Sequence, residues 1–155
     1  MSNEIQLKTT INGIEYDLTV PARLLASDFL RDKLNLTGTH VGCEHGICGS
    51  CTIKIDGLTA RSCLKFAVQL DGKKVETVES FKEKPETRNI LEKFKAHHSL
   101  QCGFCTPGFL MVIDELLKSK IKFSENEIRE ALSGNLCRCT GSVSYTHLRA
   151  HETSP

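Results

Sequence analysis

Apolar and polar residues alternate in short runs over the first eighty positions of the chain. The period of two predicts five strands, at residues 5–11, 15–20, 52–56, 58–62 and 74–78. Asn12-Gly13 separates the first two runs and is typical of a tight hairpin turn. Leucine and phenylalanine recur at helical spacing from Leu24 to Leu34. We therefore expect a small domain over residues 1–80 in which a sheet packs against one helix.

The pattern changes after residue 80. Residues 81–87 are charged and contain a proline, as expected of a linker, and residues 88–141 then have helical periodicity. Ser124 and Glu127 form the sequence signature of a capping box, and Thr106 is expected to cap the helix before them. The helical stripes predict buried faces at Ile90, Leu91, Phe94, Phe109, Val112, Ile113, Leu116, Leu117, Ile128, Ala131 and Leu132.

Composition excludes several classes of partner. The 155 residues carry a formal net charge of +1 and contain no basic run, so nothing indicates nucleic acid. No segment approaches the roughly 18 apolar residues of a membrane span, and the first residues lack an apolar signal region. We therefore expect a cytoplasmic protein without membrane insertion. The eight cysteines are gathered in tight groups, which is unlike a dispersed disulfide framework, although zinc sites also use such groups.

The first group is Cys43, Cys48 and Cys51, with Cys63 twelve residues later. Spacings of four and two residues followed by a distant fourth cysteine are the pattern by which plant-type ferredoxins hold a 2Fe–2S cluster. Glycines surround these cysteines, so the loop can turn several sulfurs inward and direct backbone N–H groups at them. With the strand pattern, this predicts a ferredoxin-like β-grasp over residues 1–80.

The second group is Cys102 and Cys105, followed by Cys137 and Cys139. Each pair precedes or follows a predicted helix, so two helical hairpins packed antiparallel would bring the four sulfurs to one point. Spacing alone leaves zinc and an iron–sulfur cluster both open for this group.

Taken together, the two groups resemble the small iron–sulfur subunit of the molybdenum hydroxylases, the xanthine dehydrogenase, aldehyde oxidase and carbon monoxide dehydrogenase family. The resemblance covers residues 5–141, and four segments carry it, at residues 42–51, 61–63, 101–108 and 134–141. It implies an α+β chain in which the β-grasp precedes an all-α, four-helix-bundle-like domain. It also implies a 2Fe–2S cluster on each cysteine group.

The resemblance further implies an electron-transfer role within a larger oxidoreductase. The cluster on the second group would lie nearer a molybdopterin on a large partner subunit, with Gln101 and Cys139 facing the pterin. The cluster on the first group would lie nearer FAD on a medium partner subunit, in a heterotrimer or its dimer. No catalytic residue is expected on this chain, which has neither a Rossmann fingerprint nor a P-loop.

One alternative remains open from the residues: a free-standing ferredoxin-like carrier or redox sensor without a molybdenum partner. The substrate of a complex cannot be read from this chain, because another subunit would select it. Residues 142–155 depart from the family pattern and are expected to be a truncated or foreign end, since they lack a core-facing stripe.

Overall fold

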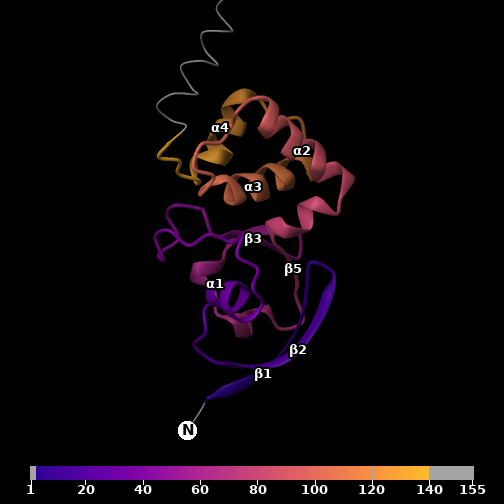
Figure 1. The fold of residues 1–155 in the computed structure, drawn as a ribbon, viewed down its shortest axis with the longest axis vertical. Helices are drawn as coiled ribbons and strands as arrows, with labels where there is room; N and C mark the ends of the chain where they lie inside the picture. The colour runs from indigo at the N-terminus through magenta and orange to yellow at the C-terminus, as the bar shows by residue number, and fades with distance from the viewer. Residues whose placement is uncertain (1–2, 120, 140–155) are drawn as a thin grey trace, which may run out of the picture.

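The computed structural model describes residues 3–119 and 121–139. Five strands form one mixed sheet in the order β2-β1-β5-β3-β4 (Figure 1). The strands are β1 (Glu4–Ile11), β2 (Ile14–Pro21), β3 (Thr52–Ile55), β4 (Leu58–Arg61) and β5 (Lys74–Glu76). β1 and β5 are parallel, and the other neighbours are antiparallel. All five strands lie where the alternating pattern predicts them.

The first core lies between this sheet and a short helical segment. The predicted helix is one α-helical turn, α1 (Ala26–Asp28), followed directly by a π-helical turn, η1 (Phe29–Lys33). The β1–β2 turn has positive φ at Asn12 and Gly13, as an Asn-Gly hairpin requires. The core side chains are Leu7, Ile11, Val20, Ala26, Phe29, Leu30, Ile53, Ala67, Leu70 and Val75. This core supports the loop that carries the first three cysteines.

A second core forms from the helices that follow the sheet. Three α-helices, α2 (Pro85–Ala96), α3 (Thr106–Lys118) and α4 (Glu125–Ser133), lie beyond the 3₁₀ turn η4 (Val78–Lys82). Two further 3₁₀ turns, η2 (Ser62–Leu64) and η3 (Ala67–Leu70), lie between β4 and β5. Phe81, Ile90, Leu110 and Met111 make the buried centre of this second core.

The prediction of a separate all-α, four-helix-bundle-like domain is wrong. Within the described residues, α3 packs directly on β3 and β4 of the sheet, and it also contacts η4, α4 and Ile90 of α2 (Figure 1). Lys54 of β3 pairs with Asp114 of α3, and the N–H of Thr59 in β4 donates to Glu115 at 2.9 Å. The sheet therefore occupies the side of α3 that a bundle would give to other helices.

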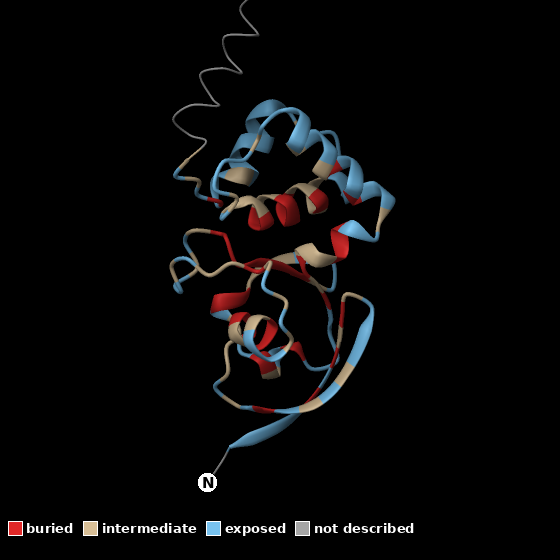
Figure 2. Cartoon of the chain, in the orientation of Figure 1, coloured by how far each residue is buried: buried red, intermediate tan, exposed pale blue. Residues whose placement is uncertain are grey.

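The predicted buried faces of α3 and α4 are also corrected by the structure. The buried side chains of α3 are Pro107, Leu110, Met111, Val112 and Asp114, so Val112 is buried as predicted, whereas Leu117 is 65% exposed. α4 begins at the predicted capping box, in which the N–H of Ser124 donates to Glu127 at 2.7 Å, but the helix has no buried residue (Figure 2). Periodicity located these helices but only part of the faces that they bury.

The structure describes the predicted linker but not the predicted tail. Residues 81–87 contain the end of η4 and the first turn of α2, and Phe81 is buried in the second core. The predicted atypical tail, residues 142–155, lies outside the described residues.

Candidate iron–sulfur sites

The first cysteine loop turns by means of residues with positive φ. Glu44, Gly46 and Gly49 have φ values of 57°, 82° and 78°. A Cβ on Gly46 would lie 2.4 Å from Leu64 Cδ1, the end of an exposed side chain that can move, so the positive φ is what favours glycine there. The loop carries Cys43, Cys48 and Cys51, and η2 places Cys63 beside Cys51 and near Cys43.

The sulfurs of this first quartet lie in contrasting electrostatic surroundings. The N–H of Cys48 donates to Cys43 Sγ at 3.3 Å. Together with the N–H of His45 it lowers the pKa of the Cys43 thiol to about 6, because donors aimed at sulfur favour the thiolate. Burial, and then the neighbouring Cys51 thiol, raises the pKa of Cys63 to about 11.

The second quartet is assembled at the N-terminus of α3 and beyond the end of α4. Cys105 is the residue at which α3 is capped, one position earlier than the predicted Thr106, and no side chain caps this helix. Cys102 Sγ and Cys139 Sγ lie 3.4 Å apart. The N–H of Phe104 lowers the pKa of Cys102, whereas burial and the nearby Cys137 thiol raise the pKa of Cys105 to about 12.

Both quartets fit a 2Fe–2S cluster in the chemistry of their donors. All eight cysteines are free thiols, and each quartet combines an N–H donor that lowers the pKa of one thiol with a desolvated thiol of raised pKa, Cys63 or Cys105, that metal ligation would deprotonate. Among the described residues, no three His, Cys, Asp or Glu side chains converge closely enough to hold a single metal ion. A binuclear cluster requires a wider arrangement, because its four thiolates are divided between two irons.

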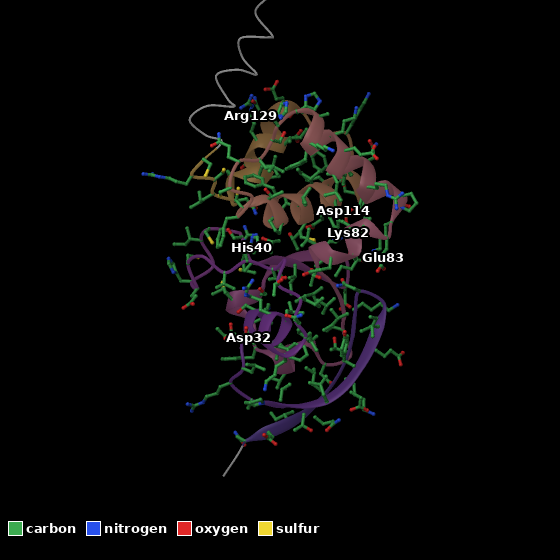
Figure 3. The ribbon with its side chains drawn as sticks, viewed as in Figure 1. Asp32, His40, Lys82, Glu83, Asp114 and Arg129 are labelled. Atoms are coloured by element: carbon green, nitrogen blue, oxygen red, sulfur yellow. The ribbon has the colours of Figure 1, made fainter. Side chains whose placement is uncertain are left out.

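The two quartets lie on adjoining loops. The N–H of Leu136, next to Cys137, donates to the carbonyl of Cys48 at 2.9 Å. His40 stacks on Phe104 with ring centroids 4.9 Å apart, and its Nδ1 donates to the Phe104 carbonyl at 2.8 Å (His40 is labelled in Figure 3). A cavity of about 460 Å³ is lined by Gly42, Cys43, Cys48, Ser50, Cys102, Phe104, Cys105, Leu136, Cys137, Arg138 and Cys139.

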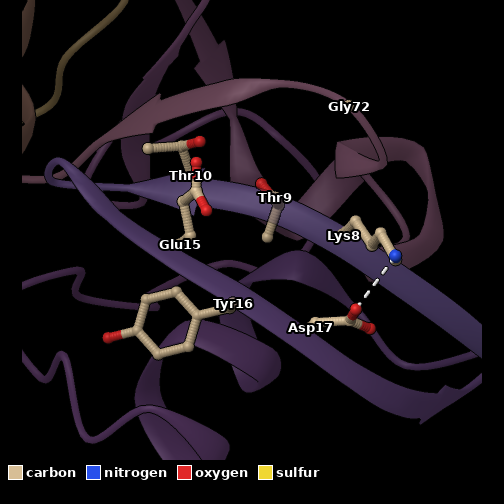
Figure 4. A pocket seen from close by; sticks show the side chains of 7 residues that line it. All are labelled: Lys8, Thr9, Thr10, Glu15, Tyr16, Asp17 and Gly72. Atoms are coloured by element: carbon tan, nitrogen blue, oxygen red, sulfur yellow. Dashed lines mark ion pairs between the residues drawn. The ribbon is translucent and has the colours of Figure 1, made fainter.

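Gln101, which directly precedes Cys102 in the chain, is exposed. A separate hollow lies on the β1–β2 hairpin beside Gly72, where Lys8 and Asp17 form an ion pair of 3.0 Å (Figure 4). It contains none of the predicted site residues, and its lining side chains are those of an exposed sheet surface. The chemistry of this chain is therefore concentrated at the cysteine loops.

Several residues that hold the two loops together were missed by sequence reasoning. Asn135 donates through Nδ2 to the carbonyl of Gly49 at 3.1 Å, and Arg61 Nη2 donates to the carbonyl of Gly134 at 2.7 Å. Lys54 and Asp114 form a buried ion pair between β3 and α3. The only available signal was the position of Gly134-Asn135 immediately before the last cysteine pair. No local pattern pairs Lys54 with Asp114, sixty residues later.

No described helix is long and apolar enough to cross a membrane.

Comparison with known proteins matches residues 34–99 to a 2Fe–2S iron–sulfur cluster binding domain and residues 77–148 to a [2Fe–2S] binding domain. Each of the two matched segments contains all four cysteines of one quartet.

Individual relatives agree with these matches. Caffeine dehydrogenase subunit gamma of Pseudomonas sp. (strain CBB1) is 51% identical over 144 residues, which cover 91% of this chain and 86% of that protein. The xanthine dehydrogenase iron–sulfur-binding subunit of Escherichia coli O157:H7 is 37% identical, with coverage of 90% and 89%. A chain of quinoline 2-oxidoreductase from Pseudomonas putida 86 superposes with a TM-score of 0.86 at 45% identity, covering 92% of this chain and 88% of that chain. The protein thus belongs to the iron–sulfur subunits of the molybdenum hydroxylase family, as an electron-transfer subunit of an oxidoreductase.

Proposed function

We propose that this chain carries two 2Fe–2S clusters in series and relays electrons from a molybdopterin-binding large subunit to an FAD-binding medium subunit. Cys43, Cys48, Cys51 and Cys63 would hold one cluster, and Cys102, Cys105, Cys137 and Cys139 the other. Each cluster, when bound, supplies a one-electron redox step. The chain itself then has to hold the two sites at a fixed separation and keep their sulfurs ionised.

The single observation that carries this proposal is the direct contact between the two cysteine loops. The hydrogen bond from the N–H of Leu136 to the carbonyl of Cys48 joins a residue of the first quartet to the neighbour of Cys137 in the second. Sites built on separate, unconnected modules would not need such a contact. The shared cavity, which touches cysteines of both quartets, supports the same conclusion.

The first and second cores support a division into a cluster module over residues 1–80 and another over residues 88–141, joined through residues 81–87.

The orientation of the relay is inferred from which side chains of the second quartet are exposed. Gln101 and Cys102 are exposed, so a pterin of the large subunit has access there. We assign Gln101 and Cys139 to that contact, and the first quartet to the side of the medium subunit. The assembly is a heterotrimer or its dimer.

The test is co-expression with candidate large and medium subunits, followed by purification through a tag on this chain. We expect the three chains to elute together and substrate to reduce the flavin. In the assembled complex, Cys102→Ser should abolish flavin reduction by substrate while the molybdenum centre is still reduced. Unchanged flavin reduction in that variant would refute the role of the second quartet. Elution of this chain alone would favour the free-standing carrier.

A further inference from the structure

Asn135 lies where three segments of the two cysteine sites meet. Its side chain is 5% exposed, and its Nδ2 donates to the carbonyl of Gly49, between Cys48 and Cys51. Its own N–H donates to the carbonyl of Leu132 at 3.0 Å, which ties it to the end of α4. Two residues further along the chain lies Cys137. One amide group therefore touches the first cysteine loop and belongs to the segment that carries the second.

The packing around the Asn135 amide leaves no room for a side chain at Gly49 or Gly108. A Cβ on Gly49 would lie 2.7 Å from Asn135 Nδ2, and a Cβ on Gly108 would lie 2.6 Å from the same atom. Gly108 is the third residue of α3, immediately after Cys105 and its Thr-Pro step. The Cβ on Gly108 would also lie 2.2 Å from the Gly49 carbonyl oxygen. Two glycines thus allow α3 and the first loop to close on Asn135 from both sides.

The Asn135 side chain acts as a hydrogen-bond donor to the Gly49 carbonyl. The Gly49 carbonyl also accepts from the N–H and the hydroxyl of Thr52, at 3.2 and 2.5 Å, so this oxygen is held firmly by β3. Asn135 Oδ1 is buried and has no hydrogen-bond partner among the described residues. A buried acceptor left unsatisfied is costly, so a polar residue is kept here at a cost in stability. Its donor function toward Gly49 accounts for its presence better than packing does.

We propose that Asn135 is a positioning residue that fixes the separation of the two cysteine quartets, and so the electronic coupling between their clusters. This inference rests on the two-cluster function proposed above. A carboxylate at this position would place an acceptor against the Gly49 carbonyl oxygen and push the loops apart. A shorter apolar side chain would remove the bond and leave a void between the glycines. Either change loosens the neighbouring bond from Leu136 to Cys48.

The experiment compares the wild-type holoprotein with Asn135→Asp and Asn135→Ala. Iron and acid-labile sulfide per chain are measured first, because they report on assembly of the clusters. The magnetic interaction between the two reduced clusters is then measured by low-temperature EPR, and the exchange of the Leu136 amide by hydrogen–deuterium exchange. Asn12→Asp is the matched control: Asn12 donates to Thr77 Oγ1 at 2.8 Å on the β1–β2 turn, outside both cysteine loops.

We expect Asn135→Asp and Asn135→Ala to retain the wild-type iron content, to show a weaker interaction between the clusters and to exchange the Leu136 amide faster. Asn12→Asp should match the wild type in all three. An unchanged magnetic interaction in iron-replete Asn135 variants overturns the inference and leaves the two-cluster function intact. Loss of a cluster from both Asn135 variants also overturns it, because Asn135 would then serve assembly. A wild-type chain with only one cluster overturns the proposed function itself.

Discussion

The buried ion pair between β3 and α3 provides a sharp test of how the helices are held on the sheet. Lys54 and Asp114 are 1% and 2% exposed. Lys54 Nζ also lies 3.1 Å from Glu76 Oε2, and Asp114 Oδ2 lies 3.0 Å from Lys118 Nζ. Asp114 is visible on the side of α3 that faces the sheet (Figure 3). The perturbation is Asp114→Asn, which keeps the shape of the side chain and removes its charge.

The expected loss follows from desolvation of Lys54. Removing one partner of a buried ion pair costs about 3–5 kcal/mol, because the other charge remains buried without compensation. Glu76 still neutralises part of the Lys54 charge, so the lower end, about 3 kcal/mol, applies here. For a chain of this length each kcal/mol lowers Tm by about 2–4 °C, which gives a decrease of about 6–12 °C.

The assay is thermal unfolding of the anaerobic holoprotein, followed by far-ultraviolet circular dichroism at one fixed scan rate. Lys8→Met is the control, because the Lys8–Asp17 pair is exposed and should contribute little. Lys54→Met combined with Asp114→Leu should recover more than half of the loss, since no uncompensated buried charge remains. A Tm for Asp114→Asn that matches the Lys8→Met control would refute this reasoning.

Three further predictions concern single sites. Cys105→Ser should remove the iron of the second quartet and leave that of the first, as measured by iron per chain and by loss of one of two EPR signals. Burial raises the pKa of Glu76, but hydrogen bonds from Lys84 and Lys54 outweigh this effect, so the pKa of Glu76 lies below its ordinary value. The Glu76 carboxylate therefore stabilises the fold at pH values above the ordinary pKa, and this stabilisation is lost as the pH falls through the lowered pKa. Glu76→Gln should therefore flatten the dependence of Tm on pH on the acid side, and an unchanged slope would contradict this. Ser124→Ala should destabilise α4 by about 1 kcal/mol through loss of its N-cap, seen as faster amide exchange in residues 125–133 but not in α3.

Local sequence patterns predicted the elements well where a short-range rule decides them. The Asn12-Gly13 turn and the Ser124–Glu127 capping box both lie where their signatures place them. The cysteine loop was also recognisable, because its glycines and ligand spacing occur within nine residues. Each of these features depends on a few consecutive residues, so no knowledge of the rest of the fold was needed.

The failures concern contacts between residues far apart in the sequence. Lys54 alternates with apolar neighbours in β3, a pattern typical of a solvent-exposed face, but α3 covers that face and buries it. The stripe of α3 was assigned only partly correctly for the same reason: Val112 is buried as expected, but Asp114 is also buried because a lysine of the sheet meets it, and Leu117 is exposed. The expected bundle was wrong because the sheet, rather than a further helix, provides the surface on which α3 packs.

The central claim is that the chain holds two 2Fe–2S clusters on adjoining loops. The most direct measurement is iron and acid-labile sulfide per chain on anaerobically purified protein, with low-temperature EPR after dithionite reduction. We expect four irons and four sulfides per chain, since each 2Fe–2S cluster contributes two of each, and two distinct rhombic signals. Two irons and one signal would contradict it, and would show that only one of the two cysteine quartets holds a cluster.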